Sequence, residues 1–348
     1  MQGVLELPDN LVPLQTLVLG SLERVSTVFE RELDSELPPV AEMCVHVERY
    51  RGKMLRPTLV FVAGLAASDN AAASLDAEAK GLITPAHVTV AAVCEMVHMA
   101  TLVHDDVLDE AEIRRRGSTL NTLRGNEEAV ILGDYLIASA YHLCSQMPTT
   151  GPARAIGRTS QVMCAGELLQ LHHRNNWSLD EATYLEILEG KTGALIATAC
   201  ELGAQLSTDD SARSKALARF GLTLGVAFQI QDDLLDLTGD EGVVGKSVRK
   251  DLEKGKLTLP LIHHLGAASP EVRGRSLALI EAAAGRDGGE DAVGELIAAV
   301  GETGSLEASK AKARELVAQA KRSLEVLPPS PARDLLSMMA DAVVDRAF

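Results

Sequence analysis

One long apolar segment constrains the fold of this chain more than any other feature. Thr84 followed by Pro85 is a typical helix start, because threonine can cap the first N–H groups and proline is tolerated at the first helical position. The pattern that follows, AHVTVAAVCEMVHMATLVHDD, stays helical for about 22 residues, or roughly 33 Å. Because this helix is apolar on most sides, we expect it to lie at the centre of a helical protein.

The composition also favours an all-α fold. Aromatic residues make up only 3% of the 348 residues, and the β-branched residues are scattered rather than alternating. No Gly-, Ser- or Pro-rich break is long enough to be an interdomain linker, so we expect one all-α domain over residues 1–348. Further helices are predicted near 11–33, 38–50, 54–67, 127–146, 152–172, 179–188, 191–206, 210–236, 258–267, 270–284, 290–301, 306–324 and 330–346.

Charge and cysteine usage exclude several classes of function. The net charge of −16 argues against nucleic acid or an anionic membrane as the main partner. The N-terminal segment lacks a basic region before its apolar residues, and no run of 18 uncharged apolar residues occurs, so we expect neither a signal peptide nor a transmembrane segment. The cysteines form no C-x-x-C pair and are expected to be reduced, buried side chains of a cytoplasmic protein. They are Cys44, Cys94, Cys144, Cys164 and Cys200.

A doubled acidic motif is the main functional signal. The spacing D-D-x-x-D occurs at the end of the apolar helix, in ATLVHDDVLDEAEIRRRG, and again 127 residues later (232 − 105) in FQIQDDLLD. Its members are Asp105, Asp106 and Asp109, and Asp232, Asp233 and Asp236. On a helix, positions i and i+4 share a face, so each motif brings together like charges that repel.

A divalent cation would reverse that cost. Mg²⁺ prefers oxygen ligands and typically takes one or two carboxylates together with substrate phosphates. Two such clusters facing each other would hold a Mg²⁺-bound diphosphate. The alternative for a single motif is a solvated, charged helix end, and the second copy favours the metal site.

Cations stand beside the acidic motifs and near Gly-rich breaks. Arginine forks match phosphate oxygens, and lysine supplies a compact positive charge. In a chain of net charge −16, these separate basic elements indicate diphosphate binding, although any one lysine alone is more often solvated. They are Lys53, Arg56, Arg114, Arg115, Lys191, Lys246 and Lys256.

Taken in order, these segments resemble the all-trans isoprenyl diphosphate synthases of the long-chain type. The collinear set is GKMLRP, EMVHMATLVHDDVLDEAEIRRRGS, GELLQ, KTGAL, FQIQDDLLD, GK and DLEKGKLTLP. The resemblance spans nearly the whole chain. It implies the class I isoprenoid synthase fold, a helical bundle around a central cavity, and a prenyltransferase activity that joins isopentenyl diphosphate to an allylic diphosphate.

The resemblance also implies roles for individual residues. About three Mg²⁺ on the allylic diphosphate would be held by Asp105, Asp106, Asp109, Asp232, Asp233 and Asp236. The residues expected to act in catalysis are Asp105, Asp106, Asp109, Lys191, Asp232 and Asp233. The allylic diphosphate site would comprise Arg114, Lys191, Lys246 and Lys256, with Thr192 and Gln229 near the reacting carbons. The metal-free diphosphate of isopentenyl diphosphate would be bound by Lys53, Arg56, His98 and Arg115.

Some of these assignments have plainer alternatives. A histidine on an apolar helix, such as His98, is usually a satisfied core residue. Glu95, Glu167 and Gln170 are expected to be interior polar residues that hold helices together. Arg249 stands where the family usually has glycine, which puts in doubt the mobility of the segment after Lys246. A homodimer is expected from the resemblance alone.

Small residues one helical turn before Asp105 predict a long product. One turn rises 5.4 Å, close to one isoprene unit, so Ala100 and Thr101 are expected to meet the tail of the growing chain. The lining predicted on this helix is Val93, Cys94, Met96, Val97, Ala100 and Thr101. In the family that this chain resembles, large aromatics at these positions close the pocket and give short products. Since none stands here, the resemblance implies about six to ten isoprene units, with the pocket floor on a facing helix such as 127–146. These residues could instead serve only helix packing.

Three other functions share some of these features. A geranylgeranyl diphosphate synthase would use the same chemistry with a shorter pocket. A class I terpene cyclase usually carries a different second metal motif and lacks the elements for isopentenyl diphosphate that this chain has. A non-catalytic partner subunit of a heteromeric synthase would be expected to have degraded aspartate motifs, and both are intact here.

Overall fold

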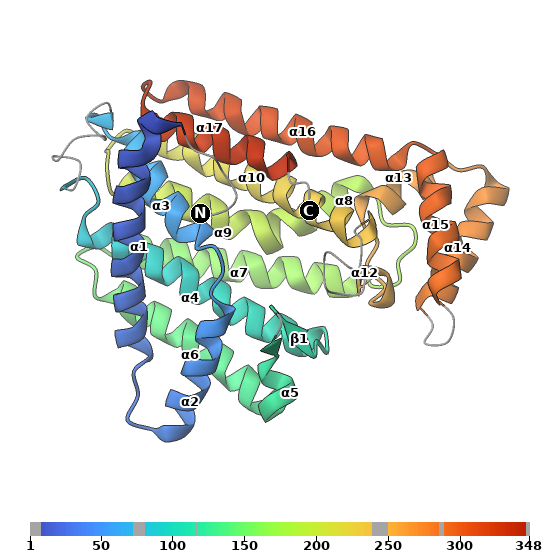
Figure 1. Ribbon diagram of the computed structural model, residues 1–348, viewed down its shortest axis with the longest axis horizontal. Coiled ribbons are helices and arrows are strands. Elements are labelled where there is room, and N and C mark those ends of the chain that lie inside the picture. Colours follow the sequence, from blue (N-terminus) through green and yellow to red (C-terminus); the bar gives the residue numbers. More distant parts are fainter. Residues whose placement is uncertain (1–7, 72–80, 116, 239–249, 285–288, 346–348) are drawn as a thin grey trace. The chain divides into compact units, whose positions relative to one another are not determined.

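Helices account for most of the residues that the structure describes. The computed structural model describes residues 8–71, 81–115, 117–238, 250–284 and 289–345 (Figure 1). The β-structure within these ranges is a two-stranded antiparallel ribbon of β1 (Ile113–Arg114) and β2 (Gly117–Ser118). The predicted all-α fold is confirmed.

The described residues divide into two compact units. Unit 1 comprises Met1–Gln161, Leu195–Gly221 and Ser323–Met338, and unit 2 comprises Val162–Ala194, Leu222–Arg322 and Met339–Phe348. The expectation of a single domain stays a prediction, and each unit is described by itself below.

The helix bounds follow the predicted segments closely. Wholly or almost wholly in unit 1 are η1 (Asp9–Leu11), α1 (Val12–Leu33), α2 (Pro38–Val47), η2 (Glu48–Tyr50), α3 (Leu55–Ala67), α4 (Pro85–Leu108), α5 (Leu120–Arg124), α6 (Asn126–Ser145), α9 (Ala194–Gln205) and η6 (Leu324–Val326). Unit 2 holds α8 (Glu181–Leu188), η5 (Glu189–Gly193), α12 (Lys250–Glu253), α13 (Leu259–Ala267), α14 (Pro270–Ala284), α15 (Gly289–Glu302) and α16 (Ser305–Ser323). Residues of both units occur in α7 (Gly151–His172), α10 (Ser211–Thr238) and α17 (Pro331–Val344).

Helix α4 is the central helix of unit 1, as its sequence predicts. Pro85 occupies its first turn, and Thr84 and His87 form a reciprocal capping box. The helix packs against α1, α3 and α6, so it is buried on most sides. By length and composition alone α4 could cross a membrane, but 72% of its apolar window is buried inside the protein, as in the core helix of a globular unit.

The core of unit 2 is built from several shorter helices. Buried leucines of α10, α13 and α15 pack with Tyr184 of α8 and Ile280 of α14. Helices α14 and α15 lie side by side (Figure 1). The sequence predicted two separate helices at 179–188 and 191–206, but the π-helical turn η5 joins α8 to α9 without a break. Such π turns occur frequently at functional sites.

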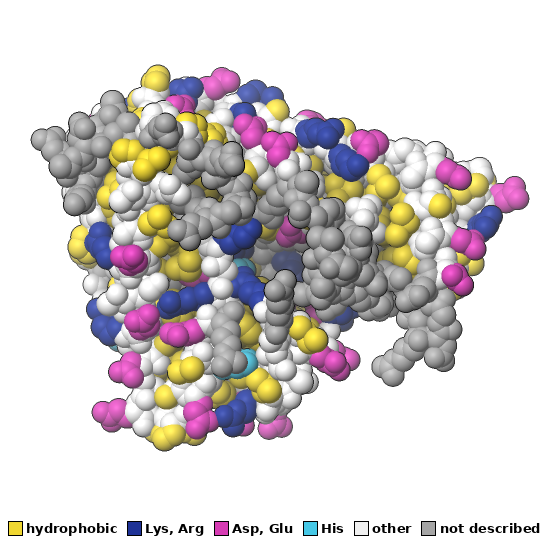
Figure 2. Space-filling view, viewed as in Figure 1, with side chains coloured by type: hydrophobic (Ala, Val, Ile, Leu, Met, Phe, Trp, Pro, Cys, Tyr) yellow, Lys and Arg dark blue, Asp and Glu magenta, His cyan; other side chains and the backbone are white. Residues whose placement is uncertain are grey.

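Charged side chains of both signs are interspersed with hydrophobic ones on the face that Figure 2 shows.

The five cysteines are all free thiols, as the absence of a C-x-x-C pair predicts. Four of them are buried, but Cys164 is exposed on α7, so the expectation that every cysteine is buried was wrong at this position. Cys164 is exposed together with the next residue, Ala165, whereas Met163 and Gly166 on either side of this pair are buried.

Candidate active site

The last turn of α4 carries the first acidic motif. Asp106 is 1% exposed, while Asp105 and Asp109 are half-buried. Asp109 caps the helix, and its backbone N–H donates to the carbonyl oxygen of Asp105 at 2.8 Å, so the two residues are one helical turn apart. The C-terminal end of a helix carries partial negative charge. Three carboxylates at this end are therefore unfavourable unless cations offset them.

Arg114 supplies one such cation. Its Nη2 lies 2.7 Å from Oδ1 of Asp106, and its Nε donates to both carboxylate oxygens at 2.8 and 3.0 Å. Burial by itself would lower the pKa of Arg114, but the hydrogen bond and charge of Asp106 outweigh it and raise the pKa. The pair is a forked, charge-assisted contact of the kind that also recognises phosphate.

Tyr50 joins the acidic motif to the segment RGKMLRP. Its hydroxyl accepts a hydrogen bond from the backbone N–H of Leu120 at 2.9 Å and also bonds to Asp106. The guanidinium carbon of Arg114 lies 5.9 Å from the centroid of its ring. Burial, together with the charge of Asp106, raises the pKa of Tyr50 to about 12, so the hydroxyl keeps its proton and remains a donor.

Arg115, the next residue after Arg114, serves a different cluster. Its Nη1 donates to the backbone carbonyl oxygen of Tyr50, and its charge acts on the carboxyl group of Glu95. The backbone of Arg115 has φ of 49°, the left-handed conformation that tight hairpin turns favour. The two arginines therefore make different contacts, Arg114 with Asp106 and Arg115 with the carbonyl oxygen of Tyr50.

The second cluster surrounds Glu95 on α4. Glu95 is 2% exposed; burial raises its pKa, and the charges of Arg56, Arg115 and Arg51 oppose that rise. Arg56 stands in the first turn of α3, and its buried Nε has no hydrogen-bond partner in the described part of the chain.

His98 lies one turn further along α4 than Glu95. Burial, together with the charges of Arg56, Arg115 and Arg114, holds the pKa of His98 well below its usual range. The imidazole is therefore neutral at pH 7 and can donate one hydrogen bond to an anion. Lys53 is exposed beside Gly52. Cations thus outnumber the one carboxylate of this cluster.

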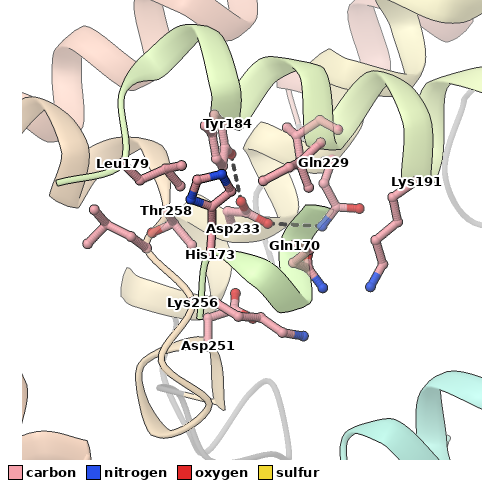
Figure 3. Close-up of a pocket in the computed structure, with 13 residues that line it drawn as sticks. Gln170, His173, Leu179, Tyr184, Lys191, Gln229, Asp233, Asp251, Lys256 and Thr258 are labelled. Carbon is pink, nitrogen blue, oxygen red and sulfur yellow. Dashed lines mark hydrogen bonds between the residues drawn. The ribbon is translucent and has the colours of Figure 1, made fainter. Parts of the chain in front are cut away.

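The second acidic motif lies on α10 in unit 2. Asp232 and Asp236 are half-buried, while Asp233 is 7% exposed. Tyr184 donates its hydroxyl proton to Oδ2 of Asp233 at 2.6 Å, and Gln229 donates from Nε2 to Oδ1 at 2.9 Å (Figure 3). Burial and the charge of Asp251 raise the pKa of Asp233 to about 8. A nearby cation would favour the charged form and lower this pKa.

A pocket opens beside this motif (Figure 3). Its lining comes from α7, α8, η5, α10 and the segment around α12. The residues are Gln170, His173, Leu179, Tyr184, Ile187, Leu188, Lys191, Gln229, Asp233, Asp251, Lys256, Leu257 and Thr258. Four residues predicted for the allylic site or the metal are therefore gathered around one pocket: Lys191, Gln229, Asp233 and Lys256.

The π-helical turn η5 positions Lys191 and Thr192. The Nζ of Lys191 lies 2.6 Å from Oε2 of Glu167 on α7, and Thr192 donates to Oε1 of Gln229 at 3.1 Å. A Cβ added at Gly166 would lie 2.7 Å from the backbone nitrogen of Lys191, so glycine permits α7 to approach the turn this closely. Glu167 therefore pairs with a predicted ligand rather than only joining helices.

Two groups of residues singled out in the sequence remain to be located, the segment after the second acidic motif and the predicted chain-length pocket. Lys246 and Arg249 lie outside the described residues. The residues predicted for the chain-length pocket are all on α4: Val93, Cys94, Met96, Val97 and Ala100 are at most 2% exposed, and Thr101 is half-buried. Thr101 donates its hydroxyl proton to the carbonyl oxygen of His98 at 2.7 Å, so its methyl group is the part left for packing.

The donor chemistry fits magnesium. Each motif offers hard carboxylate oxygens next to cations suited to phosphate, although the described residues form no ready-made group of three or more metal-ligating side chains. Mg²⁺ commonly binds through one or two carboxylates and completes its shell with water and substrate phosphates. Each motif, taken by itself, therefore suits a divalent cation that has further oxygen ligands.

Some contributors were missed from the sequence. Tyr184, Tyr50 and Asp251 were not singled out, and Glu95 was expected only to hold helices together. A signal existed for the tyrosines, since the chain has only 4 and two of them hydrogen-bond to motif aspartates. Nothing in the sequence identifies which tyrosine meets which aspartate, because the partners are far apart along the chain.

Comparisons with known proteins bear on the family and the fold of this chain. The polyprenyl synthetase family model matches residues 38–298. An octaprenyl diphosphate synthase of Escherichia coli is 31% identical over 97% of this chain and 99% of its own length. A heptaprenyl diphosphate synthase component 2 of Bacillus subtilis is 33% identical over 92% of this chain and 88% of its own length. The crystal structure of a decaprenyl diphosphate synthase from Rhodobacter capsulatus superposes with a TM-score of 0.85 at 33% identity, covering 96% of this chain and 98% of that one.

Proposed function

The chain belongs to the polyprenyl synthetase family, and from that membership we propose that it elongates an allylic diphosphate with isopentenyl diphosphate. The observation that carries the proposal is the separation of two adjacent arginines. Arg114 forms an ion pair with Asp106 of the acidic motif, whereas Arg115 donates to the carbonyl oxygen of Tyr50 and lies against Gly52. Two neighbouring cations with two different environments suit a reaction that binds two diphosphates, one with metal and one without.

The residues of this chain have distinct parts in the reaction. Mg²⁺, when bound, stabilises the diphosphate that leaves the allylic substrate, and Asp105, Asp106, Asp109, Asp232, Asp233 and Asp236 would hold it. Arg114, Lys191, Lys246 and Lys256 are proposed to bind the same diphosphate, so that negative charge is stabilised as the C–O bond breaks.

The second substrate is proposed to bind at the cluster around Glu95. Lys53, Arg56 and Arg115 provide cations, and neutral His98 provides one N–H donor. The double bond of isopentenyl diphosphate then attacks the allylic cation, a C–C bond forms, and a proton is lost to the released diphosphate. Thr192 and Gln229 are proposed to lie near the reacting carbons. No protein nucleophile is required.

Product length is proposed to be set between α4 and α6. Helix α6 packs along α4, and a Cβ at Gly133 would overlap the ring of His104. Further along α6, the thiol of Cys144 raises the pKa of Cys94, which lies ten residues before His104 on α4. Helix α6 therefore runs antiparallel to α4 from Gly133 towards Cys144. Within that span the buried α6 residues Leu136, Ala140 and Leu143 are the proposed floor beneath Ala100 and Thr101.

Self-association and compartment are proposed as well. Leu123, Val130 and Ile131 are 52%, 40% and 63% exposed on α5 and α6, which suits a contact with a second copy of this chain. Five free thiols suit a reducing, cytoplasmic environment. A heteromeric synthase is the alternative assembly, because two similar proteins are named component 2.

The decisive experiment is an elongation assay. The protein is incubated with Mg²⁺, isopentenyl diphosphate and farnesyl diphosphate, and the products are identified by mass spectrometry, with a chelator-treated sample as the control. We expect metal-dependent products of about six to ten isoprene units. Products of four units would support the geranylgeranyl alternative. No elongation with any allylic primer would favour the partner-subunit alternative.

A further inference from the structure

Arg51 is a cation near the cluster around Glu95 that has no role in the proposed binding of either diphosphate. It follows Tyr50 and precedes Gly52 in the segment RGKMLRP, and its charge acts on Glu95 alongside those of Arg56 and Arg115. The cluster around Glu95 therefore contains three guanidinium groups and one carboxylate. Arg51 and Arg56 are half-buried and Arg115 is exposed, so this surplus of positive charge at a partly buried site favours the binding of an anion.

The hydrogen-bond donors of Arg51 are incompletely used. Its Nε and Nη2 are buried, and neither has a partner in the part of the chain that the structure describes. These two nitrogens carry three of the five N–H donors of a guanidinium. Buried donors of this kind usually have a partner, so the arrangement lacks an acceptor close to Arg51.

The contact between Arg51 and Phe29 does not supply that acceptor. The guanidinium carbon lies 4.4 Å from the centroid of the Phe29 ring, a cation–π distance. An aromatic ring offers no oxygen or nitrogen acceptor, so this contact does not take the place of a hydrogen-bond partner for the N–H groups. Phe29 therefore fixes the orientation of Arg51 and leaves its donors for another group.

The start of α3 adds to the positive potential. The first turn of this helix has no acidic residue and no side-chain cap, and it carries Arg56, whose Nε also lacks a partner among the described residues. The N-terminal end of a helix has partial positive charge and favours an anion. Two arginines with nitrogens that have no partner among the described residues thus lie at or just before a helix end of the same sign.

We propose that Arg51 is a further ligand of the metal-free diphosphate, which it binds together with Arg56 and Arg115. The inference rests on the proposed function, because it takes the anion to be the diphosphate of isopentenyl diphosphate. The planar fork of Arg51, held by Phe29, donates to diphosphate oxygens. Its loss weakens the binding of this substrate and leaves the allylic substrate unaffected.

The test compares Arg51→Met with Arg213→Met. Methionine keeps an unbranched apolar side chain against Phe29 but has neither charge nor N–H donors. Arg213 is a matched control in unit 1, since it bonds to the carbonyl oxygen of Ala67 and to Asp69, away from the cluster. Isopentenyl diphosphate is titrated calorimetrically in the presence of chelator, and both KM values and kcat are measured with Mg²⁺.

We expect Arg51→Met to weaken isopentenyl diphosphate binding about tenfold to a hundredfold, the usual effect of losing hydrogen bonds to a charged group. The KM for the allylic substrate and the binding by Arg213→Met are expected to stay within about twofold. Arg51→Lys is a second variant, which keeps the charge in case Arg51→Met does not fold. We expect it to bind isopentenyl diphosphate about threefold to tenfold more weakly, because lysine lacks the planar fork of donors.

Two results would overturn the inference. Unchanged binding of isopentenyl diphosphate by Arg51→Met, with or without a lower melting temperature, would assign Arg51 to packing against Phe29. An equal weakening in Arg213→Met would assign the effect to general loss of stability. If the unsubstituted protein elongates farnesyl diphosphate, either result refutes only the proposed role of Arg51. If the unsubstituted protein elongates no primer, the proposed function itself is refuted.

Discussion

The guanidinium of Arg115 lies directly against the backbone of Gly52. A Cβ added at Gly52 would be 3.0 Å from Cζ of Arg115 and 3.1 Å from its Nη1. The same guanidinium donates to the carbonyl oxygen of Tyr50, so it is held over the segment that carries Lys53 and Arg56. Glycine therefore permits the close approach of this guanidinium, and a Cβ at this position would require the Arg115 side chain to shift.

Replacing Gly52 by alanine should displace Arg115. Because Arg115 is proposed to bind the metal-free diphosphate, Gly52→Ala is expected to raise the KM for isopentenyl diphosphate about tenfold, the cost of roughly one charged hydrogen bond. Steady-state kinetics with each substrate varied in turn measures this. Gly20→Ala is the control, since a Cβ there meets nothing within 4 Å; equal KM values in the two variants would contradict the prediction.

Asp106→Asn should impair both activity and stability. The substitution removes the charge that pairs with Arg114 at 2.7 Å, and breaking a largely buried pair costs about 3 kcal/mol. We expect kcat/KM to fall at least about a hundredfold, as when one transition-state stabilising group is lost. Activity is followed across a Mg²⁺ titration and unfolding in urea. Asp134→Asn, at a side chain 63% exposed, should leave both unchanged, and a similar loss there would count against a specific role for Asp106.

Tyr184→Phe should weaken the second acidic motif. It removes the hydroxyl that donates to Asp233 at 2.6 Å and leaves that buried carboxyl with one fewer partner, at a cost of about 1–3 kcal/mol. We expect a lower kcat and a higher Mg²⁺ concentration for half-maximal rate. Tyr141→Phe on α6 provides a control of the same chemistry. An unchanged Mg²⁺ dependence in Tyr184→Phe would show that Asp233 does not need its tyrosine.

Thr101→Phe should shorten the product. The added ring would project from α4 one turn, or about 5.4 Å, before the metal-binding end, into the space proposed for the growing tail. Mass spectrometry of the products measures the shift. Thr101→Val is the matched control, because it loses the bond to His98 without adding bulk. Products of the original length from Thr101→Phe would assign this face of α4 to packing alone.

Stability should fall in mild acid because of His87. Its Nδ1 accepts a hydrogen bond from the backbone N–H of Thr84 at 3.2 Å, and burial lowers its pKa from 6.5 to about 4. A depressed folded-state pKa gives stability that is complete above about pH 6.5 and is lost as the pH falls towards 4, by about 3 kcal/mol in total. Urea unfolding at pH 7 and 4.5 should show a smaller difference for His87→Gln than for the unsubstituted protein. A difference as large in both would exclude His87 as the source.

The fold could be predicted well because helix signals are local. Pro85 after Thr84, the apolar run to Asp106 and the breaks at Gly- and Pro-rich segments depend on neighbours within a few residues. The π-helical turn at Glu189–Gly193 was not predicted, since a π turn differs from an ordinary helix only in the partners of its N–H groups. The exposure of Cys164 was missed for a related reason, because burial depends on what packs against a helix.

By itself, the sequence determined which helices form and which residues carry oxygen, guanidinium and ammonium groups at their ends, because helix periodicity and motif spacing are short-range properties. Only the tertiary structure decided how those groups are paired. Tyr184 meets Asp233 across 49 residues and Arg115 meets Tyr50 across 65, and burial then sets whether Asp233, His98 and Glu95 are charged. These properties arise from desolvation and from contacts between distant segments, and a linear pattern carries no record of either.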